Sequence, residues 1–302
     1  MQDGIHDTPR AVLIASLSHS GSTLLDLLLG SNSRMCSLGE VHESFRGMGS
    51  EPPNPCTCGQ HVDSCVVWGH MRELWRADPG ISYREFHAAL IDRVHECLGP
   101  GTIPIDSSKH LLSFRALEDG GLDGVRVLFL MKDVRSLAES MGRWKFDWHE
   151  RYKRNMLYNV LRWFFANRKL LRFVREANLP VMHIGYEELC FRPALLLRTA
   201  CEFLGVEFQE SMLTPEAAHS HMLEGNRMRF NPDKRGGITY DPRWFFSKRI
   251  VLGSWMLLPF LEWNRRHVYS NLYRYLSEAW RDRPRESAAT QGLPAGAEIG
   301  DS

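Results

Sequence analysis

The stretch Val12–Gly30 restricts the fold of this chain more than any other. Residues 11–17 are small or apolar, as in a buried strand, and the leucines from Leu24 to Leu29 form an apolar helix face. Small and hydroxyl-bearing residues join the two segments: Ser18, His19, Ser20, Gly21, Ser22 and Thr23. A strand, tight loop and helix in this order aim backbone N–H groups and a positive helix end at an anion. The stretch predicts a phosphate-binding loop, although an ordinary strand-to-helix turn has the same pattern.

The loop differs from the phosphate-binding loop of nucleoside triphosphatases. That loop needs a lysine directly after its second glycine, which contacts the outer phosphates. Ser22, rather than a lysine, follows Gly21. The sequence therefore disfavours a kinase or an ATPase.

Composition excludes several other classes of protein. The 302 residues carry a net charge of +1, which argues against a general nucleic-acid binder. Residues 1–10 lack the apolar segment of a signal peptide, and the apolar run 250–261 is too short to span a bilayer. Seven cysteines are too few for a disulfide framework in a chain of this length. We expect a cytoplasmic protein without a transmembrane segment.

Strand patterns alternate with helix patterns along the chain. Strands are expected at 102–106, 125–131 and 180–185, and helices include 82–98, 148–178 and 195–204. Ser82 and Glu85 form a capping box at the start of one helix, and residues 31–38 are expected to form a turn. The alternation predicts an α/β fold with three layers, in which helices flank a doubly wound, mostly parallel sheet. We expect one domain over 11–282, a loose lead-in at 1–10 and a disordered tail at 283–302.

Titratable residues follow several of these segments. Glu40 comes shortly after the loop-helix unit, Lys109 and His110 open the helix expected after strand 102–106, and Lys132 follows strand 125–131. Open α/β sheets bind their ligands at the carboxyl ends of strands. These residues are therefore candidate site residues, although each also fits a solvated loop or the first turn of a helix.

Residues 51–68 form an unusual insertion rich in proline and cysteine. Cys56, Cys58, His61 and Cys65 offer four ligands of the types that zinc prefers, at a spacing unlike that of common zinc fingers. A disulfide from Cys56 or Cys58 to Cys65, or a thiol-rich loop without metal, fits the same residues.

The last third of the chain has a different character. From residue 215 onward, cations, histidines and glycines gather in a loop that includes His219, His221, Lys234, Arg235 and Gly236. Such a loop suits a lid over an anion, although a mobile surface loop has the same composition. Residues 244–282 are helical in pattern and rich in aromatic residues. This composition fits packing against the domain best, although a partner contact or a membrane surface has the same pattern.

Three of these segments together resemble the sulfotransferases that use 3′-phosphoadenosine-5′-phosphosulfate. The segments are residues 18–23, residues 132–140 and residues 186–189 with the following Phe203-Leu204-Gly205. The resemblance spans about residues 11–245 and implies a P-loop-like sulfotransferase fold. It implies that residues 18–24, including Leu24, bind the 5′-phosphosulfate and that Lys132 and Ser140 bind the 3′-phosphate. Tyr186 would lie near the nucleotide, and the loop at Lys234, Arg235 and Gly236 would close over it.

Two positions depart from the family pattern. His19 replaces the usual lysine or arginine before Ser-Gly, so its charge would depend on pH. Lys132 replaces the usual arginine, which keeps the charge but loses the bidentate fork.

The resemblance also implies roles in the transfer. Glu40 follows Gly39 as the base does in tyrosylprotein-type sulfotransferases, with His110 as the alternative base and Lys109 stabilising the leaving group. No metal is expected in the reaction.

Two other functions compete with sulfuryl transfer. They are ATP-dependent phosphoryl transfer and a non-catalytic protein that kept the nucleotide site. The expected acceptor is a small molecule, a lipid or a carbohydrate. No nucleic-acid partner is expected, and a homodimer is left open.

Overall fold

A parallel sheet of five strands organises the computed structural model, which describes residues 8–271 except 52, 119, 144–154 and 232–236. The strands are β1 (Ala11–Ser16), β2 (Met35–Gly39), β3 (Ile103–Lys109), β4 (Val125–Met131) and β5 (Val181–Gly185). They lie in the order β2-β3-β1-β4-β5, and every pair of neighbours is parallel. The predicted α/β fold with a doubly wound sheet is confirmed.

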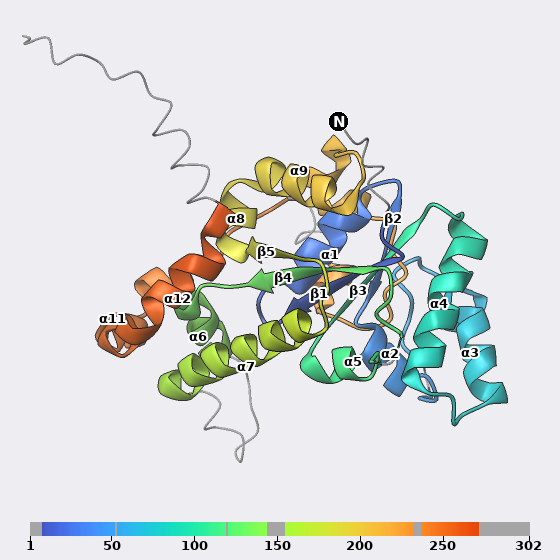
Figure 1. Cartoon of the computed structure of the whole chain (residues 1–302), viewed down its shortest axis with the longest axis horizontal. Coiled ribbons are helices and arrows are strands. Elements are labelled where there is room, and N and C mark those ends of the chain that lie inside the picture. The colour runs from blue at the N-terminus through green and yellow to red at the C-terminus, as the bar shows by residue number, and fades with distance from the viewer. Residues whose placement is uncertain (1–7, 52, 119, 144–154, 232–236, 272–302) are drawn as a thin grey trace, which may run out of the picture.

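Helices cover both faces of the sheet. Val12 and Ile14 of β1 point to one face, with α1 (Ser22–Gly30) and α9 (Pro193–Leu204). Leu13 and Ala15 point to the other face. That second face packs against α4 (Tyr83–Leu98), α5 (Leu111–Arg115), α6 (Val134–Arg143) and α7 (Met156–Glu176). In Figure 1, α1 and α9 lie above the sheet and α5 and α7 below it, which gives the three layers.

Several helices begin and end where the sequence signals predict. α4 starts after Ser82, whose hydroxyl accepts from the Glu85 N–H while Glu85 binds the Ser82 N–H in return. α9 ends at Gly205, which has a left-handed φ of 69°. Of the helix expected over 148–178, α7 accounts for 156–176. Its expected start lies outside the described residues.

Two segments differ from expectation, and both contain buried serines. Residues 35–39 pair with β3 as the strand β2 rather than forming a turn, and the buried Ser37 hydroxyl donates to the Asp26 carbonyl at 2.7 Å. β3 continues through Lys109 instead of ending at Asp106, so residues 107–109 belong to a strand and not to a helix. The Ser107 hydroxyl donates to Asp26 Oδ2 at 2.6 Å, which satisfies a polar group that burial would otherwise penalise.

The remaining elements are helical and lie in the following order along the chain. Near the insertion they are α2 (Val41–Arg46), η1 (Val62–Ser64) and α3 (Trp68–Ala77). After β5 comes α8 (Tyr186–Phe191), and the segment after α9 contains η3 (Glu210–Leu213), η4 (Pro215–Ala217), η5 (Arg227–Phe230) and η6 (Arg243–Phe246). The helical region expected from 244 begins as α11 (Lys248–Leu252), η7 (Ser254–Leu257) and α12 (Leu258–Val268), and residues from 272 onward lie outside the described part. No helix in the described residues has the length and apolar character needed to cross a membrane.

Candidate active site

A candidate site residue or loop lies at the carboxyl end of each of the five strands. The loop at 17–21 follows β1, Glu40 follows β2, Lys109 ends β3, Lys132 follows β4 and Tyr186 follows β5. Because the strands are parallel, their carboxyl ends lie together at one end of the sheet. β1 is central, with β2 and β3 on one side of it and β4 and β5 on the other, so the strand order reverses beside β1, where such sheets bind ligands.

The loop after β1 has the backbone geometry of an anion site. Gly21 is the N-cap of α1 with φ 95°, and it has no side chain that could cap the first N–H groups. The first turn of a helix has no internal acceptors for these groups, so they point to a ligand. A Cβ at Gly21 would lie 2.5 Å from Cδ2 of Tyr186, so the loop also lies directly against the Tyr186 ring. Glycine is required at this position for both reasons.

The rest of the predicted loop is packed around this turn. Ser20, Ser22, Thr23 and Leu24 are buried, whereas Ser18 and His19 are half-buried. Thr23 Oγ1 accepts from the Asn226 N–H at 3.4 Å. Asn226 belongs to the loop expected to form a lid, so part of that loop reaches the phosphate-binding loop.

Lys132 places a buried cation beside the loop. The residue is 5% exposed, and its Nζ lies 4.3 Å from the centroid of the Tyr186 ring. Burial lowers the pKa of Lys132, and the carboxyl of Glu187 opposes that effect. The Lys132 carbonyl accepts from Trp163 Nε1 at 2.9 Å, which fixes the backbone at the end of β4. A buried cation in this position would favour the binding of an anionic ligand.

His19 lies in a positively charged environment. Its backbone has a φ of 70°, and burial followed by the charges of Lys109, Lys132 and Arg162 lowers its pKa to about 4. The imidazole is therefore neutral at pH 7, in contrast to the charge change near neutral pH that its residue type suggests. The charges of three cations from different parts of the chain thus act on His19. Arg162 of α7 was not among the sequence candidates, because the helix pattern does not tell that this side chain lies near the loop.

Asp133 connects the Lys132 segment to the C-terminal helices. It is fully buried and accepts from Arg135 Nε at 2.9 Å and Nη2 at 2.7 Å. Asn264 Nδ2 and the Tyr269 hydroxyl each donate to Asp133 Oδ2 at 2.9 Å. These hydrogen bonds hold the pKa of Asp133 below its usual value despite burial. Arg135 thus binds Asp133 and is no free ligand for phosphate.

Glu187 occupies the same buried region as Asp133. Burial, and then the charge of Asp133, raises the pKa of Glu187 to about 8. Its Oε2 accepts from the Asp133 N–H at 2.9 Å. Burial and Asp133 thus disfavour ionisation of this carboxyl, whereas Lys132 favours it.

Glu40 and Lys109 form an ion pair at the ends of β2 and β3. Their side chains are 15% and 10% exposed, so the pair is shielded without being sealed. Both adjoin unusual backbone, with φ 73° at Gly39 and 57° at Lys109. The Glu40 N–H donates to the Glu224 carbonyl at 3.4 Å, which brings in the segment after η4.

A polar cavity of about 420 Å³ opens beside Glu40. Its lining is Glu40, Glu43, Arg46, Gly47, Glu224 and Gly225. Arg229 donates to the Leu223 carbonyl at 2.8 Å and to the Gly225 carbonyl, so it fixes one wall of this cavity.

His110 lies next to this pair as the N-cap residue of α5. Burial, and then Lys109, lowers the pKa of His110, while Glu40 acts in the opposite direction. The geometry therefore leaves two candidate bases, the carboxylate of Glu40 and the neutral imidazole of His110.

A buried hydrogen-bond network centred on Asp106 lies in β3, three residues before Lys109. Asp106 Oδ2 accepts from the Tyr83 hydroxyl and lies 3.2 Å from His87 Nε2, and Oδ1 accepts from the Ser108 N–H at 2.7 Å. The Ser108 hydroxyl in turn accepts from the His42 N–H at 2.8 Å. The network joins β3 to α2. Lys109 ends β3 and Glu40 directly precedes α2, so the same hydrogen bonds fix the backbone next to both residues.

Other predicted residues lie farther along the chain. Ser140 is half-buried on α6, the helix that follows Lys132. Lys234, Arg235 and Gly236 lie outside the described residues.

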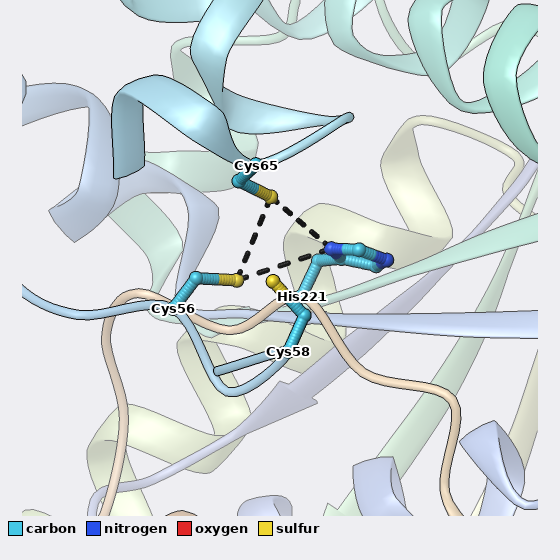
Figure 2. A group of neighbouring side chains, drawn as sticks. All are labelled: Cys56, Cys58, Cys65 and His221. Carbon is cyan, nitrogen blue, oxygen red and sulfur yellow. Dashed lines mark hydrogen bonds between the residues drawn. The ribbon is translucent and has the colours of Figure 1, made fainter. Parts of the chain in front are cut away.

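The cysteines of the insertion lie together, but with a different histidine from the one expected. Cys56, Cys58 and Cys65 surround His221, and their ligand atoms all lie within 4.8 Å of one another (Figure 2). The expected ligand His61 is instead the N-cap of η1, where its Nδ1 accepts from the Asp63 N–H at 3.4 Å. That assignment was wrong because a short cysteine-rich segment does not reveal which distant histidine packs against it. The three thiols are free rather than joined in a disulfide.

Comparison with solved structures finds sulfotransferases across most of the chain. The sulfotransferase domain of the olefin synthase from Synechococcus PCC 7002 is 22% identical with a TM-score of 0.44, covering 82% of this chain and 86% of that one. The sulfotransferase domain from the curacin biosynthetic pathway is 19% identical with a TM-score of 0.48, covering 88% and 98%. Retinol dehydratase, solved with androsterone and the inactive cofactor PAP, is 13% identical with a TM-score of 0.40, covering 85% and 81%. No family model and no curated protein matches the sequence.

Proposed function

We propose that this protein transfers a sulfuryl group from 3′-phosphoadenosine-5′-phosphosulfate to a hydroxyl or amine. One observation carries the proposal. The phosphate-binding loop after β1, the buried Lys132 and the Glu40–Lys109 pair all lie at the carboxyl end of the sheet. An anion loop alone fits any phosphate ligand. A carboxylate beside it, facing a separate cavity, adds the base that an acceptor nucleophile needs.

The donor nucleotide would lie along the loop and Lys132. In this arrangement the N–H groups at the start of α1 bind the 5′-phosphosulfate, and Lys132 with Ser140 of α6 binds the 3′-phosphate. The Tyr186 ring, which touches the loop and Lys132, would border the nucleotide. Residues 234–236 would close the site as a lid.

The transfer itself assigns separate roles to the paired residues. Glu40 removes the proton of the acceptor as the acceptor oxygen or nitrogen forms a bond to sulfur. The bond between sulfur and the bridging oxygen breaks, and negative charge develops on the leaving 5′-phosphate. Protonation of Glu40 weakens its attraction to Lys109, so the ammonium becomes available to that leaving oxygen. The ion pair thus couples proton removal to stabilisation of the leaving group.

The cavity beside Glu40 favours a polar acceptor. Three carboxylates and one guanidinium are among its lining residues. Such a surface binds hydroxyl and amine groups by hydrogen bonds and gains little from apolar contact. Among the acceptor classes considered, we favour a carbohydrate or another polar small molecule over a lipid.

The test compares three variants for sulfuryl transfer to a panel of monosaccharides, phenols and amines, followed as release of 3′,5′-adenosine bisphosphate. Glu40→Gln is expected to lose about 10²- to 10⁴-fold in turnover, the usual contribution of a general base, while nucleotide affinity is kept. Glu43→Gln, which changes a neighbouring carboxylate of the same cavity, is the matched control. An active Glu40→Gln protein together with an inactive His110→Ala protein would assign the base to His110 instead.

A further inference from the structure

The geometry points to a structural zinc site formed by Cys56, Cys58, Cys65 and His221, apart from the reacting groups. Figure 2 shows the three thiols and the imidazole turned toward one another, with two segments of the chain contributing ligands. Cys65 Sγ lies 3.2 Å from His221 Nδ1, Cys56 Sγ lies 3.9 Å from the same nitrogen, and the two sulfurs are 3.7 Å apart.

These separations fit a tetrahedral zinc ion. With Zn–S bonds of about 2.3 Å and a Zn–N bond of about 2.0 Å, two sulfurs lie about 3.8 Å apart and sulfur and nitrogen about 3.5 Å apart. The observed sulfur pair matches the first value, and the two sulfur–nitrogen distances lie on either side of the second. Three thiolates and one imidazole also form a ligand set typical of structural zinc, with no position left for substrate.

The surroundings hold these ligands in place. The Trp68 N–H points to Cys65 Sγ at 3.5 Å, and Trp68 Nε1 donates to the His221 carbonyl. The His221 N–H donates to the Ser37 carbonyl of β2 at 2.8 Å. Thr57 exchanges hydrogen bonds with Met222, donating from its N–H at 3.1 Å and accepting at its hydroxyl at 2.9 Å. Hydrogen bonds around metal ligands orient them in this way.

The site is also accessible to an ion. Cys56 and Cys65 are 1% and 3% exposed, but Cys58 is exposed. Cys58 and His221 border a surface cavity of about 610 Å³. A bound ion would therefore be enclosed on the protein side and could enter from the cavity.

Zinc at this position would join the insertion to a wall of the proposed active site. Cys65 and His221 are 156 residues apart in sequence. Three residues after His221, the Glu224 carbonyl accepts from the Glu40 N–H at 3.4 Å, and Asn226 binds Thr23 of the anion loop. The metal would hold residues 221–226 against both Glu40 and the loop. Only this consequence for the active site rests on the proposed function.

The experiment measures zinc in protein purified under reducing conditions from zinc-supplemented cells. We expect stoichiometric zinc by elemental analysis. After exchange with Co²⁺, we expect the thiolate charge-transfer and intense visible bands of tetrahedral cobalt. Cys58→Ser and His221→Ala should each weaken zinc binding at least tenfold in a chelator competition. His61→Ala and Cys97→Ser are matched controls that should bind zinc as the unaltered chain does.

Three results would overturn the assignment. They are protein that folds without bound zinc and binds none when zinc is added, a Cys56–Cys65 disulfide found by mass spectrometry, and loss of zinc in His61→Ala but not in His221→Ala. Cys58 is exposed, so its serine variant keeps the packing of the folded chain and the test does not depend on His221→Ala alone. Zinc binding without nucleotide binding would support the metal site while refuting the proposed function.

Discussion

Asp26 lies in α1, five residues after Gly21, and is fully buried. Its Oδ2 accepts from the Ser107 hydroxyl at 2.6 Å. Burial is the dominant influence and raises the pKa of Asp26 from 3.8 to about 7, against the opposing hydrogen bonds from Ser107, Ser37 and the Gly39 backbone. The variant Asp26→Asn removes the titration while keeping nearly the same shape.

The stability difference between this variant and the unaltered chain should depend on pH. A carboxyl whose pKa is raised on folding stabilises the folded state fully below pH 3.8, and that contribution is lost as pH rises through about 7. The full loss corresponds to about 4 kcal/mol at roughly 1.4 kcal/mol for each pH unit between the two pKa values. Between pH 5 and 8, the free energy of unfolding of Asp26→Asn should therefore rise relative to the unaltered chain by about 2 to 3 kcal/mol.

Urea denaturation at a series of pH values measures this difference. Ser107→Ala offers a second check, because loss of the hydroxyl hydrogen bond should raise the pKa of Asp26 further and move the transition to higher pH. A difference between Asp26→Asn and the unaltered chain that stays constant from pH 5 to 8 would refute the reasoning. It would mean that the hydrogen bonds keep Asp26 ionised in the folded protein.

Three further predictions concern the site and its support. Gly21→Ala would place a carbon 2.5 Å from the Tyr186 ring at a φ that costs alanine about 1 kcal/mol, so calorimetry should show at least tenfold weaker binding of 3′,5′-adenosine bisphosphate. Asp133→Asn should lower the free energy of unfolding by about 1.5 to 3 kcal/mol in urea at pH 7, because the charge-assisted hydrogen bonds from Arg135 are weakened, and unchanged stability would contradict this. Arg162→Ala should raise the pKa of His19 above about 4 in an NMR titration, and a fixed pKa would show that the two residues do not interact.

The apolar strands and the loop between β1 and α1 could be predicted from sequence. Residues 125–131 are apolar throughout except for Arg126, and β4 occupies that range. Gly21 and the leucines after it mark the start of α1 in the same direct way. Central parallel strands are buried on both faces, so their composition identifies them without knowledge of their neighbours.

The polar strands could not be predicted, because their partners are distant in sequence. Ser37 is buried in β2 through a hydrogen bond to Asp26, and Ser107 is buried in β3 through the same residue. Read alone, both segments are polar and indicate turns or helix starts. Only the assembled structure supplies the partners that remove the cost of burying them.

The candidate site was predicted in part for the same reason. The structure places Lys109 beside Glu40 and Lys132 beside Tyr186, because parallel strands bring their carboxyl ends to one edge. Arg162 was missed, because a helix pattern does not tell which of its charged residues lies near the loop after β1. His221 was assigned to the anion lid rather than to the cysteines, because it lies 156 residues from Cys65 and follows no helix or strand signal.

The most direct test of sulfuryl transfer is calorimetric titration with 3′,5′-adenosine bisphosphate, with ATP and magnesium as the competing ligand. We predict binding of the bisphosphate without added metal, weakened at least tenfold by Lys132→Ala because the buried cation beside Tyr186 is lost. Absence of binding, or a preference for magnesium-ATP, would contradict the proposal and favour a phosphoryl-transfer enzyme.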